Sequence, residues 1–231
     1  MSTDDRWAYD GPPRFGTDEF YASLGRAFVA MCAVVPVLFA IEVLDTATGQ
    51  RLDALGGVRP HHLDGLDGVL LAPFLHDGFD HLYANSVPLI LLGTFVLASG
   101  ARQFLGATVV IMLVSGFGVW FTGSADSVVI GASGVLFGYL ALLLVRGVIE
   151  RRWWNLGVGL LIALLYGWQI LGILPRDPAF SWQAHLFGLL GGVLAALIFR
   201  VPRPRRPAEA ILTEAAAHSG APATATDPAR D

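Results

Sequence analysis

The chain has 231 residues, of which 54% are hydrophobic and only 15% are charged. That charged share is well below the roughly 25% of soluble domains, so the composition favours a polytopic membrane protein. The single cysteine, Cys32, excludes an intramolecular disulfide, and no Cys/His spacing of the metal-binding kind is present, so we expect neither a metal nor another cofactor. The net charge of −4 indicates no particular partner.

Six apolar segments follow one another, each long enough or nearly long enough to cross a bilayer, which takes roughly 20 residues. A polar segment, residues 1–25, precedes them and lacks the apolar core of a cleaved signal peptide. The apolar segments lie at residues 26–44, 81–99, 104–122, 131–148, 154–174 and 182–200. We therefore expect an all-α membrane protein, a bundle of six transmembrane helices over residues 26–200.

Arginine placement predicts the orientation, because basic residues accumulate in cytoplasmic loops. Most arginines lie in the N-terminal segment, in the loops near Arg102 and Arg151, and after residue 199, whereas the other loops carry mainly aspartates such as Asp45 and Asp53. We therefore expect both termini in the cytoplasm and the protein in the cell inner (plasma) membrane. Arg151 beside Trp153 is typical of an interfacial anchor and not of a nucleic-acid site.

Two further stretches lie outside the apolar segments. The long loop at residues 45–80 contains a short apolar run, residues 69–75, which predicts an amphipathic element at the membrane interface. Residues 201–231 are rich in Pro, Ala and Thr, a composition that predicts a disordered cytoplasmic tail.

Polar residues inside the apolar segments mark the candidate site, because such groups are costly in a bilayer and usually functional. They are His81 and Asn85 in the second segment, Ser133 in the fourth and His185 in the sixth. In the predicted topology these three segments all begin at the outer face, so the four side chains should lie at similar depth. His81 and Asn85 are four residues apart and therefore project from one helical face.

Small residues predict how the fourth and sixth segments meet. They are Gly131, Gly134 and Gly138 in the fourth, and Ala184, Gly188 and Gly192 in the sixth. Small residues four apart let helix backbones approach closely. Such an approach would bring the Ser133 hydroxyl within reach of the His185 imidazole, at roughly 2.6–3.2 Å.

These residue types are suited to acyl transfer. The His185 imidazole can take the proton of Ser133 during attack and return it to the leaving amine. Candidate donors for the developing oxyanion are the Asn85 amide, the His81 ring N–H and the Ser133 backbone N–H. No carboxylate has an obvious place beside His185 in the sequence, so we predict a dyad and not a triad.

The sequence resembles the rhomboid family of intramembrane serine proteases. The resemblance rests on "HLYAN" at residues 81–85, "GASGVLFG" at residues 131–138 and "AHLFGLLGG" at residues 184–192, which occur in the family order. Each motif is weak alone, but the three on alternate segments of a six-segment chain are specific together. The resemblance covers about residues 26–200.

The resemblance implies six helices around a water-filled cavity open to the extracytoplasmic side, and transmembrane proteins as substrates. It implies the following residue roles: Ser133 as nucleophile, His185 as general base, His81 and Asn85 in the oxyanion site, Phe137 against the His185 ring, and His76 as a structural histidine. Substrate would enter past the fifth segment and the loop after it, residues 167–180. One departure is "GLDGVLL" at residues 65–71, where the family often carries a Trp-Arg pair.

Other interpretations stay open. Taken alone, Ser133 is a packing residue between helices and His185 is a buried structural histidine, while Phe137 is plain core. The alternative function is a non-catalytic rhomboid-like protein that binds or remodels transmembrane helices. A small transporter would show broken helices at the membrane midplane or an inverted repeat, and the sequence contains no convincing repeat.

Overall fold

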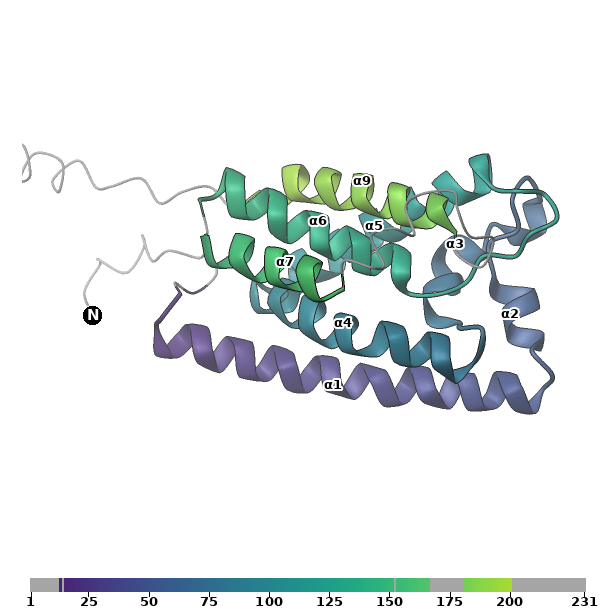
Figure 1. The fold of residues 1–231 in the computed structure, drawn as a ribbon, viewed down its shortest axis with the longest axis horizontal. Coiled ribbons are helices and arrows are strands. Elements are labelled where there is room, and N and C mark those ends of the chain that lie inside the picture. The colour runs from purple at the N-terminus through teal and green to yellow at the C-terminus, as the bar shows by residue number, and fades with distance from the viewer. Residues whose placement is uncertain (1–12, 14, 152, 167–180, 201–231) are drawn as a thin grey trace, which may run out of the picture. The chain divides into compact units, whose positions relative to one another are not determined.

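The computed structural model describes residue 13 and residues 15–151, 153–166 and 181–200 (Figure 1). Regular structure in these residues is helical, and the one strand-type pairing among them is an isolated bridge between Val58 and Val129. The elements are α1 (Asp18–Ala47), α2 (Arg51–Gly56), η2 (Leu63–Gly65), α3 (Gly68–Leu71), η3 (Ala72–Phe74), α4 (Gly78–Ala98), α5 (Ala101–Thr122), α6 (Ser133–Ile149), α7 (Trp153–Leu165) and α9 (Trp182–Ile198). The predicted tail and the predicted entry loop at residues 167–180 lie outside the described residues.

The first long helix, α1, begins before the apolar run that predicted it. Thr17 caps it, because the Thr17 hydroxyl oxygen accepts a hydrogen bond from the Phe20 N–H at 3.2 Å. Asp18 and Glu19 place negative charge in the first turn, where the helix dipole favours it. Residues 18–25, which we expected in the polar N-terminal segment, therefore form the first turns of α1.

Three helices are long and apolar enough to cross a membrane by length and composition. They are α1, α4 and α5, with 30, 21 and 22 residues. Helices α6 and α9 have 17 residues each, and α7 has 13 within the described part of the chain. At 1.5 Å per residue, α6 and α9 each reach about 26 Å, which is slightly less than the thickness of a hydrocarbon core, about 30 Å. The all-α membrane fold is confirmed with three clear candidate spans, and the count of six stays a prediction.

The long helices pack side by side around one core. Helix α1 packs against α4, α4 contacts α6, α7 covers another part of α6, and α9 contacts both α5 and α6 (Figure 1). Leu82, Ile111, Tyr139 and Leu142 are among the most deeply buried side chains of this core. Helix α9, the last described element, therefore packs along both α5 and α6.

The segment between α1 and α4 is folded against α5. Val69 of α3 is buried, and a Cβ on Gly116 of α5 would lie only 2.8 Å from the Val69 Cα atom, so the two backbones are in close contact. Asp67 starts α3, since its carboxylate accepts a hydrogen bond from the Gly68 N–H at 2.9 Å. Apolar and backbone contacts therefore anchor this segment, in which the Trp-Arg pair is absent.

Candidate active site

Ser133 is the first residue of α6 and follows a loop held from two sides. The Gly131 N–H donates to the Ala72 carbonyl oxygen at 2.9 Å, and the bridge between Val58 and Val129 fixes the preceding residues. Gly131 has a φ of +113°, a left-handed conformation that side chains rarely adopt. The loop therefore requires glycine at this position and presents Ser133 at the start of the helix.

The Ser133 hydroxyl and the His185 imidazole are in direct contact. A hydrogen bond of 2.9 Å joins Ser133 Oγ to His185 Nε2. His185 is 4% exposed, and its ring stacks on Phe137 with 4.3 Å between ring centroids and 25° between planes. The structure thus brings together the two residues predicted as nucleophile and base, and it places Phe137 against the His185 ring.

Glycines bring α6 and α9 close enough for this contact. A Cβ on Gly188 would overlap the carbonyl oxygen of Gly134, and a Cβ on Gly192 would overlap that of Gly138. These two contacts are one helical turn apart and set the backbones of α6 and α9 directly against each other. The predicted close approach through small residues is confirmed.

His81 and Asn85 lie in the N-terminal half of α4, and the His81 ring is in contact with the loop before Ser133. His81 contacts the Ser133 loop, since a Cβ on Gly131 would lie 2.7 Å from His81 Cε1 and 3.0 Å from Nε2. Asn85 is buried, and its amide donates to the His81 carbonyl oxygen at 2.9 Å. Among the described residues no hydrogen bond joins Asn85 to Ser133, although the amide has a second N–H group.

His76 is a buried histidine that packs against His81. It is 1% exposed and meets the His81 ring edge-on, with 5.2 Å between centroids. Burial, and to a smaller extent the neighbouring His81, lower the pKa of His76 to about 3. His76 is therefore neutral at physiological pH, and neither of its ring nitrogens has a hydrogen-bond partner among the described residues.

Sequence reasoning missed two polar features. Ser115, on α5, is buried and donates to the Ala184 carbonyl oxygen at 2.9 Å, immediately before His185. Asp45, expected in an exposed loop, is 1% exposed at the end of α1, where its carboxylate accepts a hydrogen bond from the Leu52 N–H at 2.6 Å. A polar residue in mid-segment was the available signal for Ser115, whereas no local pattern marks Asp45.

The site combines a hydroxyl, an imidazole and N–H donors, and the described residues contain no group of three or more His, Cys, Asp or Glu side chains that could hold a metal ion. The model of the rhomboid domain matches residues 66–202, which is more than half of the chain and includes His81, Ser133 and His185. The chain belongs to the rhomboid family, and it is a membrane protein.

Several relatives support this assignment. An uncharacterized protein of Mycobacterium tuberculosis is 41% identical over 81% of this chain and 80% of its own length. The putative rhomboid protease YdcA of Bacillus subtilis is 28% identical over 70% of this chain and 78% of its own length. The rhomboid protease GluP of the same organism is 32% identical over 72% of this chain and 33% of its own length.

Proposed function

We propose that the chain is an intramembrane serine endopeptidase that cleaves membrane-anchored proteins in or near their transmembrane segments. The observation that carries this proposal is the hydrogen bond of 2.9 Å between Ser133 Oγ and His185 Nε2. Family membership and the names of the two Bacillus relatives support it. The stacking of Phe137 on His185 adds support, because it orients the ring of the proposed base.

In the proposed reaction Ser133 Oγ bonds to the carbonyl carbon of the scissile peptide while its proton passes to His185 Nε2. The C–N bond then breaks, and the leaving amine takes the proton from His185. Water attacks the resulting ester with His185 again accepting a proton. The ester bond between Ser133 Oγ and the acyl carbon then breaks, and Oγ takes the proton back from His185 as the acid product leaves.

The oxyanion formed in both steps needs hydrogen-bond donors. We assign this role to the side chains of His81 and Asn85 and to the Ser133 backbone N–H, which lies at the start of α6 where the helix dipole favours negative charge. The contact of His81 with Gly131 supports this assignment for His81. For Asn85 the support is its position one turn further along the same face of α4.

We also propose that α6, α7 and α9 cross the membrane with α1, α4 and α5, which gives six spans over residues 18–200. Arginine placement supports cytoplasmic termini and a site that opens to the extracytoplasmic side. A transmembrane substrate would reach Ser133 between α4 and α7, where an apolar cavity of about 20 Å³ lies. Phe137 and Tyr166 are among the residues that line this cavity.

The test uses the full chain in liposomes with a model transmembrane substrate and a fluorophosphonate probe. We expect Ser133→Ala and His185→Ala to lower cleavage by at least about 10³-fold, because nucleophile and base act as one unit. Ser127→Ala, which removes a hydroxyl from the preceding loop, should cleave like the wild type. The probe should label wild-type protein and leave Ser133→Ala unlabelled.

Cleavage by Ser133→Ala at the wild-type rate would overturn the proposal. Folded wild-type protein that neither cleaves substrate nor reacts with the probe would also overturn it. That second result would favour a non-catalytic rhomboid-like protein that binds or remodels transmembrane helices.

A further inference from the structure

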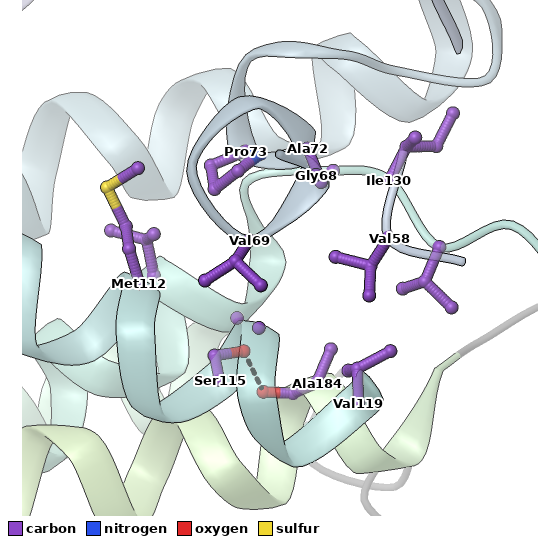
Figure 2. Close-up of a pocket in the computed structure, with 15 residues that line it drawn as sticks. Val58, Gly68, Val69, Ala72, Pro73, Met112, Ser115, Val119, Ile130 and Ala184 are labelled. Atoms are coloured by element: carbon purple, nitrogen blue, oxygen red, sulfur yellow. Dashed lines mark hydrogen bonds between the residues drawn. The ribbon is translucent and has the colours of Figure 1, made fainter. Parts of the chain in front are cut away.

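Ser115 uses its hydroxyl differently from the hydroxyls of most other buried Ser and Thr residues in the bundle. Ser86, Thr94 and Ser99 each donate to the carbonyl oxygen four residues earlier in their own helix. Ser115 instead donates from α5 to the carbonyl oxygen of Ala184 on α9, at 2.9 Å (Figure 2). Because the hydroxyl is buried, loss of the bond would leave polar groups without a partner, which is costly.

This bond lies where three helices meet. A Cβ on Gly134 of α6 would collide with Ser115 Oγ and would approach the Ala184 carbonyl oxygen to 3.2 Å. Glycine at position 134 therefore leaves the space in which Ser115 reaches α9. Gly134 directly follows Ser133, and Ala184 directly precedes His185, so the bond lies beside both members of the proposed catalytic pair.

Among the described residues, two backbone N–H groups in the first turn of α9 donate hydrogen bonds to Ser181. The Ala184 N–H donates to the Ser181 hydroxyl oxygen at 3.3 Å, and the His185 N–H donates to the Ser181 carbonyl oxygen at 3.3 Å. Both distances are longer than the typical 2.9–3.0 Å of an N–H···O bond. The bond of 2.9 Å from Ser115 is thus shorter than either, and it comes from a neighbouring helix.

We propose that Ser115 is a positioning residue that fixes the first turn of α9 and thereby holds the His185 imidazole at hydrogen-bond distance from Ser133. Phe137 fixes the plane of the imidazole ring, and Ser115 fixes the position of the backbone that carries it. This inference rests on the proposed function. A misplacement of about 1 Å in a catalytic group can lower a rate by about 10²-fold, so a single backbone tie can have a large effect on turnover.

The experiment compares Ser115→Ala with Ser99→Ala in the full chain. Ser99 is a matched control, because it is 6% exposed against 7% for Ser115 and its hydroxyl bonds only within α4. For each variant we measure kcat and KM on a transmembrane substrate, the rate of fluorophosphonate labelling and the thermal midpoint. Ser115→Thr, which keeps a hydroxyl, tests whether the hydrogen bond itself matters.

We expect Ser115→Ala to lower kcat and the labelling rate by about 10- to 100-fold, with KM unchanged. Ser99→Ala should keep wild-type rates, and Ser115→Thr should recover most of the loss. If Ser115→Ala does not fold, Ser115→Cys takes its place, because it keeps the volume with a weaker donor and should show the same direction of change.

Wild-type kcat and labelling in folded Ser115→Ala would overturn the inference, as would a Ser115→Thr protein as slow as Ser115→Ala. The two proposals fail separately. A Ser133→Ala protein without activity beside a fully active Ser115→Ala protein contradicts only the positioning role, whereas an active Ser133→Ala protein contradicts the proposed protease.

Discussion

The helices that hold Ser133 and His185 pack backbone to backbone, whereas α1 packs against α4 through side chains. Gly188 and Gly192 of α9 lie directly on carbonyl oxygens of α6. In the other interface the Met31 side chain covers Gly93, and Phe39 meets Tyr83 with 5.0 Å between ring centroids. Backbone contacts cannot adjust without moving a helix, but side chains can change rotamer. The Ser133–His185 distance is therefore set by the less adjustable of the two regions.

Helix α7 combines both kinds of packing, because a Cβ on Gly147 of α6 would lie only 2.7 Å from the Leu156 N atom of α7. A side chain of α6, Leu144, covers Gly159, and Gly157 has open space around it. At the first turn of α7, Trp154 contacts the rings of Phe20 and Phe95, with centroids 5.1 and 5.8 Å away. The backbone contact lies at the start of α7, whereas Ile162 in the later part of α7 and Tyr166 just after it line the cavity where we propose that substrate enters.

The largest effect on stability and cleavage is expected when a methyl group is added to the backbone-packed interface and not to the side-chain-packed one. Gly188→Ala places a methyl group on the Gly134 carbonyl oxygen and should destabilise the protein by about 1–3 kcal/mol while displacing His185 and abolishing most cleavage. Gly93→Ala meets only side-chain atoms of Met31, which can change rotamer, and its gain in helix propensity of about 1 kcal/mol should offset the cost. Denaturation midpoints and cleavage rates of both variants give the comparison.

The contrast fails if Gly93→Ala loses as much stability and activity as Gly188→Ala. In that case both interfaces would respond to an added methyl group in the same way, and the difference between backbone and side-chain packing would have no energetic consequence.

A smaller effect is expected from the aromatic ring beside the base. Phe137→Leu keeps an apolar side chain but removes the stacking on His185, which for an aromatic pair is worth about 0.5–1.5 kcal/mol. We expect kcat to fall by about 2- to 12-fold with a similar thermal midpoint. Phe104→Leu removes a ring that pairs with Tyr139 in the same bundle and should leave kcat unchanged. Equal kcat values in the two variants would show that the Phe137 ring has no role in orienting His185.

The sequence predicted the features that depend on helical spacing. Ser133 and His185 begin segments that start at the same face, and glycines four residues apart predicted the approach of α6 and α9, so their contact could be expected. Contacts between residues far apart in the chain could not be predicted from the sequence. The hydrogen bond from Ser115 to Ala184 joins residues far apart in the chain, and the burial of Asp45 depends on how α2 folds back on α1. Neither follows from a local period.

The C-terminal end of α1 carries carboxyl groups that are close to one another and to one in α2. The Asp45 carboxylate accepts a hydrogen bond from the Leu52 N–H of α2, and the Asp53 carboxyl group of α2 lies close to it. Burial, and after it the carboxylates of Asp45 and Glu42, raise the pKa of Asp53 from 3.8 to about 7. Asp77, before α4, adds to the same effect. Helix α2 is therefore attached to α1 beside an aspartate that is mainly protonated below about pH 7.

The smallest predicted effect follows from this pKa, and it should depend on pH. A raised pKa means that the folded state holds a proton that the unfolded state releases near pH 4, so the contribution to stability is complete below that pH and is lost as the pH rises through about 7. Asp53→Asn keeps a neutral side chain at every pH and should remove this loss. Amide exchange at Leu52, expressed as a protection factor, should fall between pH 6 and pH 8 in the wild type and stay level in Asp53→Asn. The same fall in both proteins would mean that the docking of α2 does not depend on the Asp53 proton, and the C-terminal end of α1 would then be no more sensitive to pH than the glycine-packed helices.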